Sequence, residues 1–247
     1  MLSQTQLCTQ FALQSKANAA VNPAWREAGY PYLRGAFLEA SEAMEHHGWK
    51  WWKKQECDLA QLQLELVDIW HFALSDILLT SVGSDRGSKE DDEALASGCL
   101  ASWGRASVDA LVFDEKTYRF SEFNNVVDAI ELMGAMAGVR KFNAQLFGWI
   151  MNECGMSWAD LHRQYVCKNV LNVFRQAHGY KEGSYIKIWN GREDNEHLLE
   201  IANDLDAAHP QFSEQIVSGL TERYTEVLDE QMEMQEDLAD SKVSMKG

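Results

Sequence analysis

The sequence predicts an all-α fold, a helical bundle in which two helices carry paired carboxylates. Only three prolines, Pro23, Pro31 and Pro210, interrupt the 247 residues. Residues that favour helices, such as Ala, Leu, Glu and Gln, are plentiful. Apolar residues recur at helical spacing in several segments, and no long alternating pattern typical of strands is present. We therefore expect a globular protein built from helices, without internal repeats.

The first two predicted helices lie on either side of Asn22-Pro23. The first covers residues 2–20. The second begins near Pro31, because proline is favoured in the first turn of a helix, and covers about residues 31–47. Apolar residues form one stripe along this second helix, at Leu33, Ala36, Phe37, Ala40 and Met44.

The third predicted helix, residues 61–81, is the most apolar. Its apolar residues cover most of the helix circumference, and a narrow polar stripe remains: Gln61, Glu65, Asp68, Ser75 and Asp76. A helix that is apolar nearly all round is buried. Ionised carboxylates on such a helix are costly unless they are paired or bound to a metal.

The rest of the chain is also predicted to be largely helical. A polar, charged loop is expected at residues 83–93, and helical stretches at about 90–110, 125–154 and 158–177. Residues 179–195, with three glycines, are expected to be irregular, and helix returns from residue 197. The last twenty or so residues are acidic at helical spacing, which predicts a solvated terminal helix that frays into a tail.

The bulk charge and the cysteines narrow the class of protein. The formal net charge of −16 argues against a general nucleic-acid binder, because phosphate backbones require a basic face. No apolar run reaches the length of a membrane span, and the first residues do not resemble a signal peptide. The five cysteines show no CxxC spacing, so we expect reduced thiols in a cytoplasmic protein.

Two carboxylate pairs stand three residues apart, which makes each pair neighbours on a helix. Glu65 and Asp68 lie on the apolar third helix, where a cation is the economical partner. Glu39 and Glu42 lie opposite the apolar stripe of their own helix, so a solvated face and a metal site are both open for them. Hard oxygen ligands suit Mg²⁺, with Mn²⁺ as an alternative.

A rival metal chemistry uses a different spacing. Asp68-x-x-His71, Asp194-x-x-His197 and Asp206-x-x-His209 imitate the Glu-x-x-His spacing of di-iron bundles. That motif requires Glu at its first position on two buried helices, and only the first of the three lies in an apolar run. The spacing therefore favours di-iron chemistry less than a magnesium site.

A basic island interrupts the acidic chain between residues 165 and 192. Lys168, Asn172 and Arg175 are spaced at i, i+4 and i+7, so they share one helix face. Cationic and amide donors on one face, followed by a loop with further lysines and tyrosines, suit a polyphosphate. A solvated basic face at the end of a helix, favourable to its dipole, is the alternative.

Three segments together resemble the all-α, dimeric dUTP diphosphatases. They are "EASEAMEHHGWKWWKK", "LELVDIWHFALSD" and "YVCKNVLNVFRQAHGYKEGSYIKIWNGREDN", and the resemblance spans about residues 10–80 and 145–200. Paired carboxylates alone occur across the wider all-α NTP pyrophosphohydrolase superfamily. The tryptophan-lysine block and the KN-x-x-N-x-x-R-x-x-x-x-GYK run narrow the resemblance to this family.

The resemblance implies an activity and an architecture. It implies hydrolysis of dUTP to dUMP and pyrophosphate with two or three Mg²⁺ ions, acceptance of dUDP, and a homodimer. It also implies one catalytic domain at residues 1–210, with a metal-binding part at about 1–80 and a more mobile, phosphate-gripping part at about 145–200. Residues 211–247 would form an acidic helical tail. A broader deoxynucleotide pyrophosphohydrolase, acting on dCTP or a modified nucleotide, and a non-catalytic protein of the same fold are the alternatives.

The resemblance also implies roles for individual residues. The metal ligands would be Glu39, Glu42, Glu65 and Asp68. The residues that grip the phosphates would be Lys168, Asn172, Arg175, Tyr180, Lys181 and Lys187, and Asn195 would be a further contact to the nucleotide. The residues around the uracil would be Gln14, Asn18, His71 and Phe72.

The expected mechanism is metal-assisted hydrolysis. One carboxylate of the Glu39/Glu42 pair would accept the proton of the attacking water, with Glu42 favoured. The resemblance implies attack at the β-phosphorus, and the basic residues would stabilise the leaving group.

The tryptophan-lysine block "HHGWKWWKKQ" follows the first carboxylate helix. Trp52 would wall the nucleotide pocket and Lys53 would add positive potential, whereas Trp49 and Trp51 are expected in the core. Stacking of single-stranded nucleic acid on this block is the non-enzymatic alternative, which the overall charge disfavours.

Overall fold

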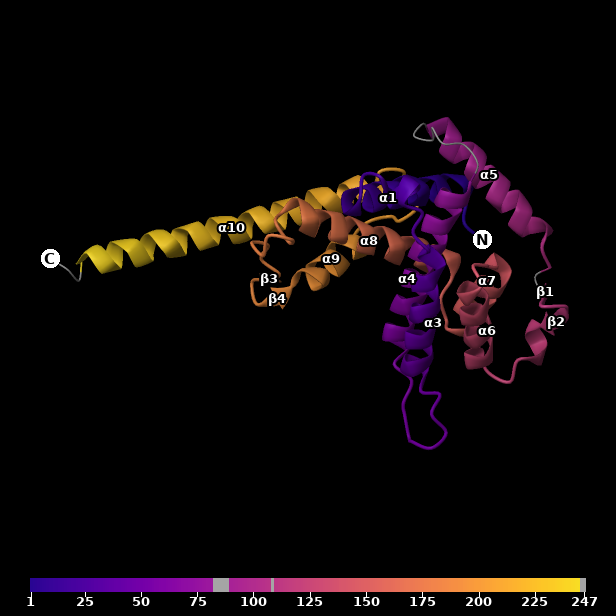
Figure 1. Cartoon of the computed structure of the whole chain (residues 1–247). Helices are drawn as coiled ribbons and strands as arrows, with labels where there is room; N and C mark the ends of the chain where they lie inside the picture. The colour runs from indigo at the N-terminus through magenta and orange to yellow at the C-terminus, as the bar shows by residue number, and fades with distance from the viewer. Residues whose placement is uncertain (82–88, 108, 245–247) are drawn as a thin grey trace. The chain divides into compact units, whose positions relative to one another are not determined.

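The computed structural model describes residues 1–81, 89–107 and 109–244, and most of its regular elements are α-helices (Figure 1). The predicted all-α fold is confirmed. Contacts divide the chain into two compact units, Met1–Tyr165 and the residues from Val166 onward, and the division falls inside helix α8 (Trp158–Ala177). The predicted catalytic domain of residues 1–210 and the tail of 211–247 remain predictions.

Unit 1, Met1–Tyr165, consists mainly of helices α1 to α7. Its elements are α1 (Gln4–Val21), α2 (Trp25–Ala28), α3 (Tyr32–His47), α4 (Leu59–Thr80), α5 (Lys89–Arg105), β1 (Ala110–Phe113), β2 (Lys116–Arg119), a 3-10 turn (Phe120–Glu122), α6 (Val126–Gly138) and α7 (Ala144–Glu153). The helices predicted at residues 2–20, 31–47 and 61–81 correspond to α1, α3 and α4.

Helices α3 and α4 pack along each other and form the framework of unit 1 (Figure 1). A glycine permits their close approach: a Cβ atom at Gly35 would lie 2.5 Å from the Cζ atom of Phe72. Helix α6 packs on α3, where a Cβ atom at Gly134 would lie 3.3 Å from that of Ala40. Side chains on α3 and α4 are therefore held at short distances from one another.

Helix α4 is buried, as its apolar sequence predicts. Its Trp70 is fully buried, and its ring is stacked on Phe147 with centroids 5.4 Å apart and packs edge to face with Trp158 with centroids 5.6 Å apart. Burial of such aromatic surface contributes several kcal/mol, of the order of 25 cal/mol per Å². The core of unit 1 thus fixes the helix that carries Glu65 and Asp68.

The ends of α3 and α4 are set by local chemistry. Helix α3 stops at Gly48, which adopts φ 84°, a conformation that glycine reaches at little cost. Helix α4 starts after Asp58, whose carboxylate accepts a hydrogen bond from the Gln61 backbone at 3.1 Å. Residues 48–58 form the loop between the two helices.

The single helix predicted at residues 125–154 is two helices, α6 and α7. Helix α6 ends at Gly138, and Arg140 then takes a left-handed φ of 63°. Asn143 caps the new helix by accepting hydrogen bonds from the backbone of Gln145 and Leu146. The periodicity continues across this break, because both helices bury one apolar face in the same core.

A β-hairpin replaces the end of the helix predicted at residues 90–110. Helix α5 ends at Arg105, and β1 pairs antiparallel with β2, with Ala110 opposite Arg119. The turn residues Asp114 and Glu115 both have positive φ, as a type I′ turn requires. Asp-Glu is a weak signal for such a turn, so the pattern did not predict the strands.

The prediction of a polar loop at residues 83–93 is wrong for residues 89–93. Helix α5 already begins at Lys89. Residues 83–88 of that prediction lie outside the described residues.

Unit 2 comprises the rest of α8, the two-residue strands β3 (Ile188–Trp189) and β4 (Arg192–Glu193), and helices α9 (Asp194–Asn203) and α10 (Phe212–Ser244). Residues 179–195, predicted to be irregular, thus contain a small hairpin and end in the first turn of α9. The helix predicted from residue 197 is interrupted between Asn203 and Phe212.

The terminal helix α10 takes part in the core of unit 2. Its apolar residues at helical spacing are buried, at Phe212, Ile216, Leu220, Tyr224 and Val227. The expectation of a solvated terminal helix is therefore wrong for Tyr224 and Val227. Side chains from residue 231 and the frayed end at 245–247 lie outside the described residues.

None of the described helices combines the length and the apolar character needed to span a membrane.

Candidate active site

Three carboxylates from two helices converge in unit 1. Glu39 and Glu42 lie on α3, Glu65 lies on α4, and one oxygen from each lies within 4.8 Å of the others. The Glu65 side chain is only 12% exposed, whereas Glu42 is exposed. Carboxylates at these distances can share a divalent cation. The sequence pattern left open whether the face of α3 with Glu39 and Glu42 is solvated or binds a metal. In the structure this face meets α4.

The charge of this cluster is concentrated enough to change a pKa. Burial, followed by the charges of Asp68, Glu42 and Glu65, raises the pKa of Glu39 to about 7. A hydrogen bond with Glu65 also favours the protonated form of Glu39. Asp68, the fourth predicted ligand, therefore acts on the same site.

One imidazole lies beside the cluster. His46 Nε2 is 3.4 Å from a carboxylate oxygen of Glu65. A neutral histidine at that distance does not balance the charge of several carboxylates, and a single imidazolium balances only one of them.

A second polar cluster joins α1 to α4. The side-chain oxygen of Gln14 accepts a hydrogen bond from the Tyr165 hydroxyl and lies 2.9 Å from His71 Nδ1. The Gln14 amide donates to Asn18 at 3.0 Å, and the Asn18 amide donates to Ser75 at 3.2 Å. The structure thus brings together Gln14, Asn18 and His71, three of the residues predicted around the base.

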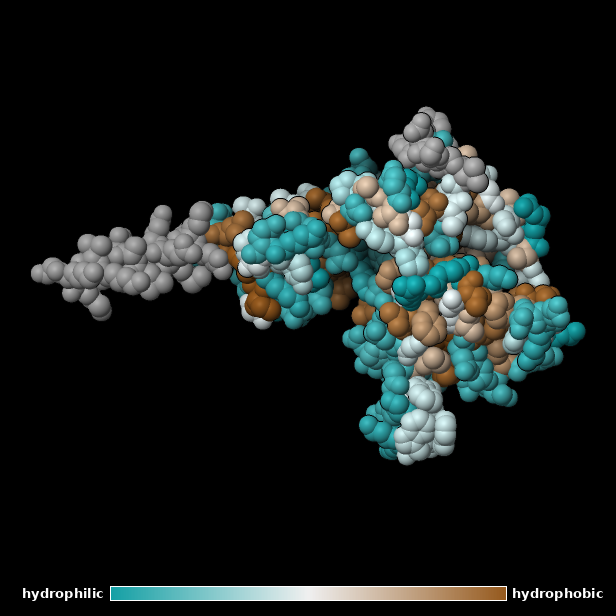
Figure 2. All heavy atoms as spheres, viewed as in Figure 1, coloured by the Kyte–Doolittle hydropathy of each residue, from teal (hydrophilic) through white to brown (hydrophobic). Residues whose placement is uncertain are grey.

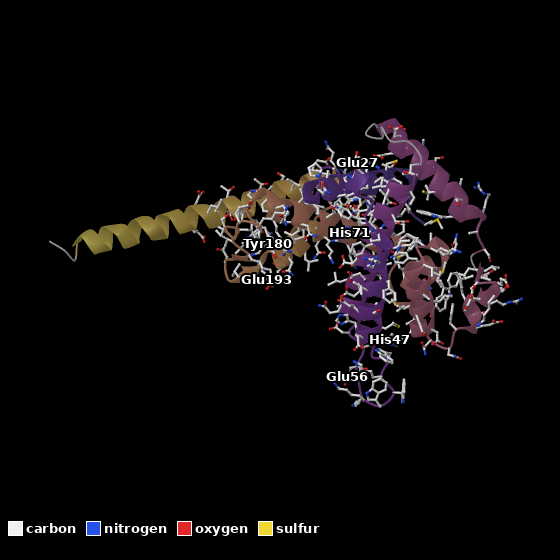
Figure 3. All side chains as sticks on the ribbon, viewed as in Figure 1. Glu27, His47, Glu56, His71, Tyr180 and Glu193 are labelled. Atoms are coloured by element: carbon white, nitrogen blue, oxygen red, sulfur yellow. The ribbon has the colours of Figure 1, made fainter. Side chains whose placement is uncertain are left out.

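Aromatic packing supports this amide cluster. The rings of His71, labelled in Figure 3, and Tyr165 lie with centroids 4.3 Å apart. Phe72, the fourth residue predicted around the base, is half-buried and its ring packs against Gly35 of α3. Tyr165 and Ser75 were not predicted as site residues, because a tyrosine and a serine in apolar helices carry no distinctive spacing.

The tryptophan-lysine block lies in the loop between α3 and α4. Trp51 and Trp52 are 85% and 59% exposed, and their rings contact each other edge to face at 4.5 Å. This loop stands out from unit 1 at the lower end of the view in Figure 2. The expectation that Trp49 and Trp51 lie in the core is wrong, because both are exposed.

Helix geometry separates this loop from the amide cluster within unit 1. Trp52 and Lys53 precede Leu59, where α4 begins, and His71 lies twelve residues further along, about 18 Å at 1.5 Å per residue. The structure does not bring Trp52 and Lys53 together with Gln14 and His71 in this chain.

In unit 2, the predicted phosphate-binding residues surround a buried ion pair. The Arg175 guanidinium donates from Nε and Nη2 to the two oxygens of Asp194, both at 2.7 Å, and the Tyr185 hydroxyl donates to Asp194 at 2.8 Å. Burial acts to raise the pKa of Asp194, but the hydrogen bonds from Arg175 and Tyr185 hold it below its usual value. The sequence pattern did not predict Asp194 and Tyr185 as site residues. In the sequence, Asp194 is only one of two adjacent acids in an "ED" pair.

The other predicted residues of unit 2 are more exposed. Lys168 is half-buried. The other predicted residues are exposed, namely Asn172, Tyr180, Lys181, Lys187 and Asn195. Lys187 forms an ion pair with Glu193 at 3.0 Å; Tyr180 and Glu193 are labelled in Figure 3. The exposed cations lie on the segment after α8, at Lys181 and Lys187, where an anion can reach them.

The comparisons with known proteins agree with the resemblance. A search of curated proteins finds no match. The family model described as dUTPase matches residues 6–180, more than two thirds of the chain, and this range includes the carboxylate cluster, the amide cluster and Arg175. The chain therefore belongs to the all-α dUTPase family and is a hydrolase of the dUTP diphosphatase type.

Proposed function

We propose that this protein hydrolyses dUTP to dUMP and pyrophosphate with Mg²⁺ held by Glu39, Glu42, Glu65 and Asp68. The observation that carries the proposal is the convergence of three of these carboxylates within 4.8 Å, inside the segment that matches the dUTPase family.

The donor set fits a hard divalent cation. All the candidate ligands are carboxylate oxygens, which suit Mg²⁺ and also Mn²⁺. The raised pKa of Glu39 supports the fit, because a bound cation would offset the repulsion among its neighbours. We propose two or three ions, which would supply positive charge to the phosphate oxygens and acidify a water molecule.

Glu42 is the residue that we propose as the general base. It is the most exposed carboxylate of the cluster, so its oxygens are accessible to water. It would accept a proton from the water that attacks the β-phosphorus, while dUMP leaves and the water oxygen becomes part of pyrophosphate. Glu39, more buried and more strongly influenced by its neighbours, would serve as a ligand and could assist as a second base.

The amide cluster of α1 and α4 is proposed as the uracil site. Uracil presents two carbonyl acceptors and one N–H donor, and the amides of Gln14 and Asn18 can donate and accept. Their mutual hydrogen bond would be exchanged for bonds to the base. His71 and Phe72 would pack around base and sugar, and a close fit would disfavour the methyl group of thymine by about 1–3 kcal/mol.

Basic and polar residues of unit 2 are proposed to bind the phosphates and, at Asn195, another part of the nucleotide. They are Lys168, Asn172, Arg175, Tyr180, Lys181, Lys187 and Asn195. Their support is the concentration of positive charge in a chain whose net charge is −16. Such donors stabilise the negative charge that develops on the phosphate oxygens in the transition state. Trp52 and Lys53 are proposed to contact the nucleotide as well.

Further properties of the proposal follow the family. We propose that the enzyme also accepts dUDP, forms a homodimer, and limits incorporation of uracil into DNA. We also propose a cytoplasmic location, because the five cysteines show no CxxC spacing and an odd number of them does not suit a disulfide framework.

The test is release of pyrophosphate from a panel of deoxynucleotides, with Mg²⁺ and with a chelator. Metal-dependent turnover of dUTP, and of no other triphosphate, is the expected result. Hydrolysis of dCTP as well as dUTP would show that the enzyme has a broader substrate specificity than proposed. Lack of turnover with every nucleotide would overturn the proposed activity.

A further inference from the structure

We infer that Asp194 is a positioning residue for the phosphate-binding part of unit 2, and that it acts through Arg175. The inference rests on the proposed function, because it assigns Arg175 to the nucleotide phosphates. Asp194 itself is completely buried and belongs to none of the predicted site residues.

Asp194 connects three parts of unit 2. Its carboxylate receives Arg175 from α8 and the Tyr185 hydroxyl from the segment between α8 and α9. Its own backbone N–H, at the first turn of α9, donates to the carbonyl of Lys187 at 3.0 Å. Asp194 therefore connects residues 179–193 to α8 and α9. This segment carries the proposed phosphate ligands Tyr180, Lys181 and Lys187.

The bidentate contact fixes the plane of the Arg175 guanidinium. Nε and one proton of Nη2 point to Asp194, whereas Nη1 makes no hydrogen bond with any of the described residues. The Arg175 side chain is 19% exposed. Asp194 thus holds one edge of the guanidinium and leaves the opposite edge to an anion, so that less rotational freedom is lost when a phosphate binds.

The aromatic side chains of the segment add to this order. The ring of Tyr185 is stacked on Tyr224 of α10 with centroids 5.3 Å apart, and the Tyr224 hydroxyl accepts the backbone N–H of Ile186 at 3.2 Å. Tyr185 is therefore held on one side by packing and on the other by Asp194. Without the carboxylate, both Arg175 and Tyr185 would keep only part of their fixed orientation.

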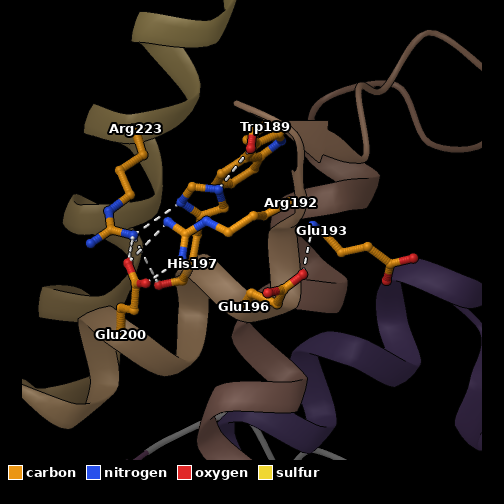
Figure 4. A network of polar contacts seen from close by, with 7 residues as sticks. All are labelled: Trp189, Arg192, Glu193, Glu196, His197, Glu200 and Arg223. Carbon is orange, nitrogen blue, oxygen red and sulfur yellow. Dashed lines mark hydrogen bonds and ion pairs between the residues drawn. The ribbon is translucent and has the colours of Figure 1, made fainter.

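A second acid of α9 provides a matched control. Glu200 also pairs with arginines, Arg192 and Arg223, but it is exposed and neither arginine is among the proposed phosphate ligands (Figure 4). Asp194→Asn and Glu200→Gln each convert a carboxylate to an amide on the same helix. A merely structural contribution of acidic residues in α9 predicts similar behaviour of the two variants.

The experiment measures the affinity of the full-length protein for inorganic pyrophosphate with Mg²⁺ by calorimetry, and KM and kcat for dUTP. We expect Asp194→Asn to weaken pyrophosphate binding and raise KM by about tenfold or more, which corresponds to loss of one charge-assisted hydrogen bond. We expect kcat to fall by a smaller factor, and Glu200→Gln to bind within about twofold of the original protein.

A double-mutant cycle then separates positioning from folding. If Asp194 acts through Arg175, pyrophosphate binds Arg175→Ala and Arg175→Ala/Asp194→Asn equally well. Additive losses in the double variant would overturn the inference. Should Asp194→Asn fail to fold, Tyr185→Phe, which removes one hydrogen bond to Asp194, is expected to weaken binding by about twofold to fivefold and to lose that effect in the Arg175→Ala background.

The outcomes distinguish this inference from the proposed function. Unchanged pyrophosphate affinity in Asp194→Asn, in a protein that hydrolyses dUTP, would overturn the positioning role alone. Absence of dUTP hydrolysis by the original protein would overturn the proposed function, and the positioning role with it.

Discussion

In unit 1, Glu39, Glu42 and Glu65 bring negative charges within 4.8 Å of one another, whereas in unit 2 Asp194 meets Arg175 at 2.7 Å. The first group raises the pKa of one of its members, and the second lowers the pKa of its acid. Repulsion among neighbouring acids, as in unit 1, therefore indicates a position where an external cation can bind. The ion pair of Asp194 with Arg175 instead fixes the orientation of the guanidinium N–H donors before a phosphate binds.

The largest expected effect comes from removing one acid of the unit 1 cluster. We expect Glu65→Gln to lower kcat for dUTP by at least about a thousandfold, because a metal ligand is lost from the reaction centre. Glu56→Gln, in the exposed loop between α3 and α4, is the control. A rate for Glu65→Gln within about threefold of the original would break the assignment of the metal site.

The next effect is on the stability of the metal-free protein. The pKa of Glu39 in the folded protein is about 7, above its ordinary value of 4.5. The folded state therefore binds this proton more tightly, so the associated stability is complete below about pH 4.5 and is lost as the pH rises through about 7. At about 1.4 kcal/mol per pKa unit the loss has an upper limit of about 3 kcal/mol, and solvent screening of this partly exposed carboxylate reduces it to about 1–2 kcal/mol.

Urea denaturation in a chelator at pH 4.5 and pH 8 measures this loss. Glu39→Gln stays neutral, so we expect it to be more stable than the original protein at pH 8 and similar to it at pH 4.5. Addition of Mg²⁺ should stabilise the original protein and not the variant. Parallel pH profiles for the two proteins would show that the acids do not repel one another as described.

A smaller effect concerns the spacing of α3 and α4, which brings the acids together. We expect Gly35→Ala to cost about 1–3 kcal/mol of unfolding free energy, because its Cβ atom would lie 2.5 Å from the Phe72 ring. The matched control is Gly98→Ala in α5, where the added Cβ atom meets no other atom within 4 Å. That variant should gain up to about 1 kcal/mol from helix propensity. Equal effects of the two substitutions would contradict the close packing of α3 on α4.

The smallest effect is expected at the exposed pairs of unit 2. Glu200→Gln removes ion pairs with Arg192 and Arg223, and we expect the melting temperature to fall by less than about 4 °C. Thermal unfolding followed by circular dichroism measures the shift. A larger loss would mean that the pairs of Figure 4, and not Asp194 alone, organise this part of the chain.

Sequence patterns predicted the helices that carry the proposed metal site and the acids on them. The apolar periodicity predicted α3 and α4, and the three-residue spacing placed Glu39 with Glu42 and Glu65 with Asp68. The pairing of α3 with α4 depends on contacts between distant residues, such as Gly35 with Phe72, which spacing does not encode. Assignment of all four acids to one site therefore came from the resemblance.

Other features could not be predicted because they depend on tertiary context. The periodicity of 125–154 hid a break that Asn143 stabilises by capping α7. Tryptophan favours burial, yet Trp51 lies in a loop after Gly48 and is 85% exposed. Asp194 looks like any surface acid of a helix start, and only its contacts with Arg175 and Tyr185 distinguish it.

The most direct test of the central claim is Mn²⁺ binding followed by electron paramagnetic resonance, in the presence of a nonhydrolysable dUTP analogue. The protein and its Glu56→Gln control should bind Mn²⁺ with the same affinity, and Glu65→Gln should bind it at least about tenfold more weakly. Equal Mn²⁺ affinity in all three proteins would show that the acids of α3 and α4 do not hold the metal.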